Sequence, residues 1–176
     1  DYEKEYEVTL TKMIKDSVKR FYKMFDVTQR IALVGPICSG KSTILKILGY
    51  VLLKIQDKIL NYSIISPKTF TYGELYGSTD NVQAYSTDIQ NRDSIYSIIL
   101  EKYKEMDKIG ETNIVKSIVI DSPIEEVDSE WTVQHSMRLQ KSQEMDYEAN
   151  KSLIKFPNGI ILDFPQDLYF FYETDS

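Results

Sequence analysis

A glycine-bounded loop between an apolar run and a helical pattern restricts the fold of this chain more than any other feature. Residues Gly35 to Ser42 read Gly-Pro-Ile-Cys-Ser-Gly-Lys-Ser, which fits the pattern Gly, four residues, Gly, Lys, and Ser or Thr. The apolar run 30–34 comes directly before the loop, and residues 41–53 have helical spacing. In such a strand, loop and helix, backbone N–H groups and the helix dipole favour negatively charged phosphates. The sequence therefore predicts a phosphate-binding loop.

Each loop residue type suits this chemistry. Gly35 and Gly40 permit a close approach of the backbone, Lys41 is expected to reach the β- and γ-phosphates, and the Ser42 hydroxyl to ligate magnesium. The alternative is an accidental strand-to-helix turn, and Cys38 is expected to be a free loop side chain and not a reactive thiol. The residues predicted to bind nucleotide are Gly35, Pro36, Ile37, Cys38, Ser39, Gly40, Lys41, Ser42, Thr43, Asp121 and Thr174.

A second signal is the apolar run 118–120 followed by Asp121, which has the form of a Walker B strand. Ser42 and Asp121 are the predicted magnesium ligands, although an acid at a strand end is common. Ser122 stands where hydrolysing enzymes place a glutamate, and a serine hydroxyl is no base near neutral pH. Glu125 and Glu126 fit acidic residues at a helix N-terminus better than a base. No catalytic residue is assigned, and binding without efficient hydrolysis is predicted.

The last strand is expected at residues 168–172. Thr174 or Asp175 after it resembles the polar residue that related ATPases hold against the γ-phosphate. A frayed chain end is an equally good interpretation of the same residues.

Apolar runs and helical patterns alternate along the rest of the chain. Residues 10–25 have amphipathic helical spacing, which favours a helix packed on the domain over one that binds a partner. Asn158-Gly159 between two apolar runs predicts a hairpin. The other expected elements are a strand at 62–66, a helix at 95–106 ended by Gly110 and a doubly buried strand at 114–120.

This alternation predicts an α/β fold, a three-layer P-loop NTPase with a parallel sheet, an N-terminal helix and an inserted β-hairpin. We expect residues 1–26 to form the amphipathic helical segment and residues 27–176 the nucleotide-binding core.

Composition excludes several classes of protein. The formal net charge of -6 argues against a nucleic-acid surface, and the single cysteine, Cys38, allows no internal disulfide, so the cytoplasm is the expected compartment. The apolar stretch 44–55 is interrupted by Lys46, Gly49 and Lys54, so neither a membrane span nor a signal peptide is expected. His135 is the single histidine, and a metal site built on it is improbable.

The loop and the Walker B strand resemble those of AAA+ ATPases, and three stretches are similar to the second AAA+ module of dynein heavy chains. They are residues 66–77 (Ser-Pro-Lys-Thr-Phe-Thr-Tyr-Gly-Glu-Leu-Tyr-Gly), 150–165 and 171–175. The family's Trp-Thr-Asp-Gly reads Ser-Thr-Asp-Ile at 86–89, and Trp131 falls about three residues late. No functional residue is carried over from 125–150.

The resemblance implies a module that binds ATP or ADP with Mg²⁺ and turns over little ATP, within a six-module ring motor that moves along microtubules. Its implied partners are the neighbouring AAA+ modules, the motor's linker, which the hairpin would face, and microtubules. The implied location is the cytoplasm and cytoskeleton, in a cytoplasmic or axonemal dynein. Compared with such modules, the chain is expected to stop after the sensor 1 strand, before the arginine offered to a neighbouring site and the helical lid.

Three alternatives are open at this stage. A free-standing P-loop nucleotide kinase would need an arginine-rich closing lid, whereas Arg20, Arg30, Arg92 and Arg138 are dispersed. A small GTPase would carry an Asn-Lys-x-Asp element, which is not in the sequence. A structural fragment with a vestigial loop would bind no nucleotide.

Overall fold

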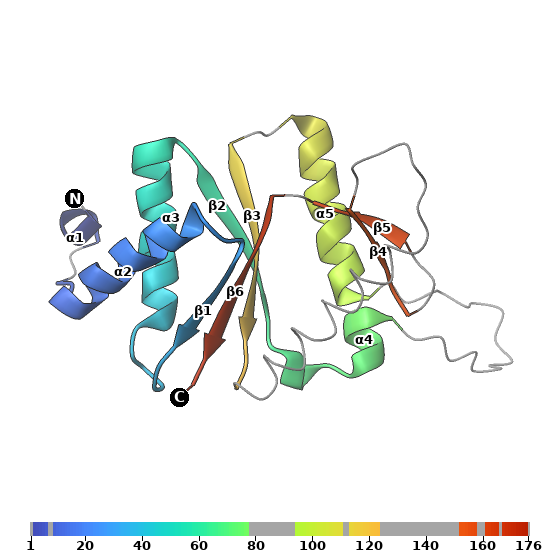
Figure 1. The fold of residues 1–176 in the computed structure, drawn as a ribbon, viewed down its shortest axis with the longest axis horizontal. Coiled ribbons are helices and arrows are strands. Elements are labelled where there is room, and N and C mark those ends of the chain that lie inside the picture. Colours follow the sequence, from blue (N-terminus) through green and yellow to red (C-terminus); the bar gives the residue numbers. More distant parts are fainter. Residues whose placement is uncertain are drawn as a thin grey trace, which may run out of the picture. The chain divides into compact units, whose positions relative to one another are not determined.

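A four-stranded parallel sheet carries the loop (Figure 1). The computed structural model describes residues 2–6, 9–77, 94–110, 113–123, 152–157, 161–165 and 167–175. The strands lie in the order β1-β6-β3-β2. Their bounds are Arg30–Val34 for β1, Leu168–Thr174 for β6, Ile114–Asp121 for β3 and Ile59–Ile65 for β2.

All three strand pairings are parallel, so the carboxyl ends of the strands share one edge. At that edge Val34 of β1 is in register with Thr174 of β6, and Asp121 of β3 is in register with Glu173. The expected burial of β3 is confirmed, because every residue between its two ends is buried. In open α/β sheets this is the edge at which ligands bind.

The chain divides into two compact units. The first comprises Asp1–Ile65, Thr112–Val127 and Asp167–Ser176, and it contains the whole sheet. The second comprises Ser66–Glu111 and Asp128–Gln166.

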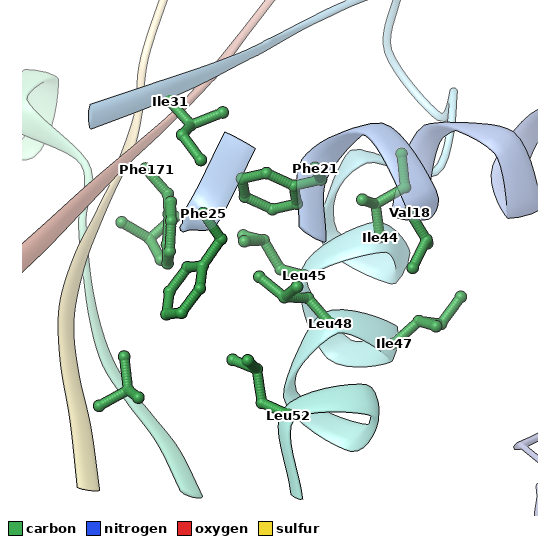
Figure 2. Packing of buried hydrophobic residues seen from close by; sticks show 12 residues of the cluster. Val18, Phe21, Phe25, Ile31, Ile44, Leu45, Ile47, Leu48, Leu52 and Phe171 are labelled. Carbon is green, nitrogen blue, oxygen red and sulfur yellow. The ribbon is translucent and has the colours of Figure 1, made fainter. Parts of the chain in front are cut away.

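In the first unit, two helices pack together and against the sheet. Helix α2 (Lys12–Phe25) and helix α3 (Lys41–Gln56) contribute most of the core, and a short helix α1 (Tyr2–Glu5) precedes them. Figure 2 shows this cluster of apolar side chains, which consists of Val18, Phe21, Phe25, Ile31, Ile44, Leu45, Ile47, Leu48, Leu52, Val115, Val119 and Phe171. The expectation that the amphipathic helix packs on its own domain is confirmed.

In the second unit, helix α5 (Ile95–Ile109) begins at Ser94, whose hydroxyl oxygen accepts from the Ser97 N–H, and is followed by Gly110 with a φ of 83°. The predicted hairpin is confirmed as β4 (Ser152–Lys155) and β5 (Ile161–Phe164), which pair antiparallel. A 3₁₀ turn, η1 (Pro67–Thr69), and helix α4 (Tyr72–Tyr76) complete this unit's described elements.

These elements together confirm an α/β fold with a parallel sheet and a hairpin, consistent with a three-layer P-loop NTPase. In the described parts of the chain, no helix has the length and apolarity that crossing a membrane requires.

Candidate phosphate-binding site

The loop is folded by its own backbone against the neighbouring strand tip. The Gly35 N–H donates to the Thr174 carbonyl at 3.1 Å, which ties the start of the loop to β6. The Ser39 N–H donates to the Pro36 carbonyl at 3.1 Å and closes a turn. Residues 38–43 line a cavity of about 270 Å³, close to the lower end of small-ligand pockets, about 300 Å³.

Gly40 requires glycine for its backbone conformation, and Gly35 lies close to a neighbouring side chain of the loop. Gly40 is the N-cap of α3 with a φ of 88°, a left-handed conformation that residues with a side chain rarely adopt. A Cβ atom on Gly35 would lie 3.0 Å from the Ser39 hydroxyl oxygen. Because Gly40 has no side chain to cap the helix, the first turn of α3 presents backbone N–H groups to an anion.

Lys41 lies across the loop. Its Nζ donates to the Gly35 carbonyl at 2.7 Å, to the Pro36 carbonyl at 3.1 Å and to Asp175 Oδ1 at 2.9 Å. The Lys41 side chain is only 13% exposed, whereas that of Asp175 is 50% exposed. The loop therefore holds an ammonium group where the sequence pattern predicts a contact with phosphates.

Ser42 contacts a carboxylate that the sequence analysis missed. Its hydroxyl donates to Glu173 Oε2 at 2.7 Å, and Glu173 is buried, with 6% of its surface exposed. Burial raises the pKa of Glu173 and the charge of Asp121 raises it further, whereas the Ser42 hydrogen bond and the Lys41 charge oppose the rise. The signal in the sequence is an acidic residue directly after an apolar run. The predicted strand ends at Tyr172, one residue before it.

Asp121 lies, as predicted, at the carboxyl end of β3, where it is exposed and in register with Glu173. Ser122 follows it, is buried, and its N–H donates to the Glu173 carbonyl at 3.1 Å. Glu125 and Glu126 lie outside the described residues.

The oxygen atoms at this edge are of the kind that magnesium prefers as ligands. Ser42 and Asp121 supply the predicted ligand types, and Glu173 adds a carboxylate beside the Ser42 hydroxyl. Within the described ranges, no three or more His, Cys, Asp and Glu side chains gather into a metal cluster. Magnesium suits such a site, because it keeps several waters and is bound by one or two carboxylates together with substrate phosphates.

Strand β6 extends to Thr174. Thr174 is 2% exposed and pairs with Val34, so the alternative of a frayed end is wrong for this residue. The Thr174 carbonyl holds the loop, and the Asp175 carboxylate contacts Lys41. Of the other predicted residues, Pro36, Ile37 and Cys38 are exposed on the loop, and Ser39 and Thr43 line the cavity. Their contacts with nucleotide stay predictions.

Comparison with known proteins identifies relatives over most of the chain. The chain is 30% identical over 160 residues to dynein heavy chain-like protein 1 of Plasmodium falciparum (isolate 3D7), which covers 89% of this chain. It is 26% identical over 161 residues, 92% of the chain, to the cytoplasmic dynein heavy chain of Paramecium tetraurelia. These matches support a dynein heavy-chain segment. No family model matches the chain.

Human axonemal dynein heavy chain 1 is similar to about half of this chain, with 36% identity over 94 residues that cover 48% of the chain. The chain spans only 2 to 3% of the length of these three relatives.

Proposed function

We propose that this chain is a nucleotide-binding AAA+ module of a dynein heavy chain, the second module of the motor ring, and that it binds ATP or ADP with Mg²⁺ without efficient hydrolysis. The observation that carries the proposal is the loop itself, in which Lys41 and the start of α3 lie at the carboxyl edge of a parallel sheet. Dynein relatives over most of the chain support the motor assignment.

In this proposal, different residues of the site contact the phosphates, hold the magnesium ion and position the loop. The N–H groups of the loop and of the first turn of α3 bind phosphate oxygens, and Lys41 contacts the β- and γ-phosphates. Ser42 and Asp121 hold the magnesium ion, which neutralises phosphate charge when it is bound. Thr174 is buried beside the loop, where its carbonyl positions Gly35.

Slow turnover follows from the residue after Asp121. A positioned general base contributes typically about 100- to 10,000-fold to a rate. Ser122 stands at that position, is buried, and has its N–H bonded to the neighbouring strand. Glu173 accepts a hydrogen bond from Ser42, on the side proposed for magnesium, so we do not propose it as a base for water.

The proposed partners are those of the ring motor: the neighbouring AAA+ modules, the linker and, through the intact motor, microtubules. The location is therefore the cytoskeleton. The hairpin is the proposed contact with the linker. Ile154 and Phe156 are buried, whereas Leu162 is half-buried and Ile161 is 50% exposed; Ile160 lies outside the described residues. An exposed apolar side chain on β5 supports this contact, which stays a prediction.

A melting-temperature titration with ATP, ADP and GTP plus magnesium tests the proposal. A ligand at 100 times its dissociation constant adds about 2.7 kcal/mol to the free energy of unfolding. We expect ATP and ADP to raise the melting temperature of the wild-type chain, and Lys41→Ala to lose most of this rise. Lys46→Ala is the matched control, because Lys46 is exposed on the same helix outside the loop.

No shift with any nucleotide would favour the vestigial-loop alternative. An equal shift in the Lys41→Ala variant would place the nucleotide elsewhere on the chain.

A further inference from the structure

Two carboxylates and a hydroxyl face the same side of the sheet at its carboxyl edge. Successive side chains of a strand alternate between the two faces of a sheet. Val119 of β3 and Phe171 of β6 belong to the core cluster that α2 and α3 cover. Asp121 and Glu173 stand two residues further along these strands, so they face the same side, and they are in register with each other. Ser42, in the first turn of α3, reaches Glu173 there.

Glu173 is held more firmly than Asp121. Its backbone is in register with Leu33 of β1 on one side and with Asp121 of β3 on the other, and its carbonyl accepts from the Ser122 N–H at 3.1 Å. Glu173 is 6% exposed, whereas Asp121 is exposed at the end of its strand. The Ser42 hydroxyl gives its single proton to Glu173 Oε2 at 2.7 Å, and this bond does not use the lone pairs of the hydroxyl oxygen. The contact therefore orients Ser42 as a ligand for a cation.

From this arrangement we infer that Glu173 makes nucleotide binding at this site depend on magnesium. The inference rests on the proposed nucleotide site and deepens it, with Glu173 as a positioning residue that acts through Ser42. Without a divalent cation, the Glu173 carboxylate adds a like charge beside the phosphates that the loop binds, so it weakens the binding of free nucleotide. The same carboxylate attracts a magnesium ion and turns the Ser42 oxygen toward it. Burial strengthens both effects, because charges interact more strongly away from water.

The effect of Glu173 is isolated by comparing one nucleotide with and without magnesium. Lys41 and the N–H groups of the loop contact the same phosphates in both solutions, so their attraction largely cancels in the ratio of the two affinities. Asp121 contributes to that ratio, but it is unchanged in a Glu173 variant. Residues that hydrogen-bond to a metal ligand typically contribute about 10- to 100-fold to metal affinity, and Glu173 is such a partner of Ser42.

Calorimetric titration of the purified chain with ADP, in magnesium chloride and in EDTA, tests this inference. ADP is chosen because its binding is measured without turnover. Glu173→Gln keeps an acceptor for the Ser42 hydroxyl and removes the charge, so we expect free ADP to bind more tightly and MgADP less tightly. The ratio of the two dissociation constants is expected to fall by about tenfold or more. Glu105→Gln makes the same change on an exposed position of α5 and is expected to leave the ratio unchanged.

The same ratio in Glu173→Gln as in the wild type would overturn the inference, even though ADP binding itself would still support the proposed function. A wild-type chain that binds ADP equally well in both solutions would also overturn it. If ADP binds to neither chain in either solution, the proposed function itself is wrong and the inference falls with it. Melting curves without nucleotide establish that the variants fold, and Glu173→Ala replaces Glu173→Gln if that variant does not.

Discussion

Glu173 is a carboxyl group buried at the end of a central strand, and its ionisation affects stability. Burial is the main reason that its pKa lies above the ordinary value of 4.5, with Asp121 adding to the rise. The folded chain therefore binds the proton of Glu173 more tightly than the unfolded chain does. As the pH rises from the ordinary pKa through the folded pKa, the unfolded state loses this proton first. The free energy of unfolding falls across this window and is constant above it.

We predict that Glu173→Gln raises the free energy of unfolding at pH 7 and that the gain shrinks at pH 4. Glutamine keeps an oxygen that accepts from the Ser42 hydroxyl but removes the buried charge. Denaturant unfolding at the two pH values measures the difference, with Glu105→Gln as the control because Glu105 is exposed on α5. A destabilised Glu173→Gln at pH 7, or an equal change at both pH values, would contradict this account of Glu173.

At the scale of elements, α2 is part of the folded core and not a free amphipathic helix. Phe21 is 2% exposed and lies edge-on to Phe171 of β6, with ring centroids 5.2 Å apart. We predict that Phe21→Ala lowers the free energy of unfolding by about 3–5 kcal/mol, the usual loss for a large core side chain. Met24→Ala on the same helix is the control, because Met24 is 46% exposed and such surface changes stay within about 0.5 kcal/mol.

Urea unfolding of both variants gives this comparison. A loss below about 1 kcal/mol for Phe21→Ala would mean that α2 leaves the sheet easily and is available to a partner after all.

Elements with a strong local pattern were predictable from the sequence, and those that depend on distant partners were not. Helical spacing located α2, α3 and α5, and a continuous apolar run located β3. Strand β6 extends two residues beyond its predicted end because it has a neighbour on each side, and sequence spacing does not show which strands those are. Helix α4 was missed although Thr71 and Glu74 form a capping box, a signal that is readable in advance.

The candidate site also has one part that a local sequence pattern reveals and another that depends on distant parts of the chain. The loop and Asp121 were found because each belongs to a short motif that carries its own strand. The Ser42–Glu173 and Lys41–Asp175 contacts join residues 131 and 134 positions apart, and they exist only because β6 lies between β1 and β3. Neither contact has a local pattern, so the sequence indicated Thr174 and Asp175 only as candidates and omitted Glu173.

The central claim for the whole molecule is that it binds nucleotide without efficient turnover, and phosphate release by the purified chain tests it most directly. The chain is incubated with ATP and magnesium, released phosphate is followed, and the nucleotide that stays bound is identified by chromatography. Lys41→Ala serves as the blank. We predict bound nucleotide on the wild-type chain with no steady release above the blank. Steady turnover above about 1 per second that is lost in Lys41→Ala would contradict the account, because Glu173, Glu125, Glu126 or another group would then act as the base.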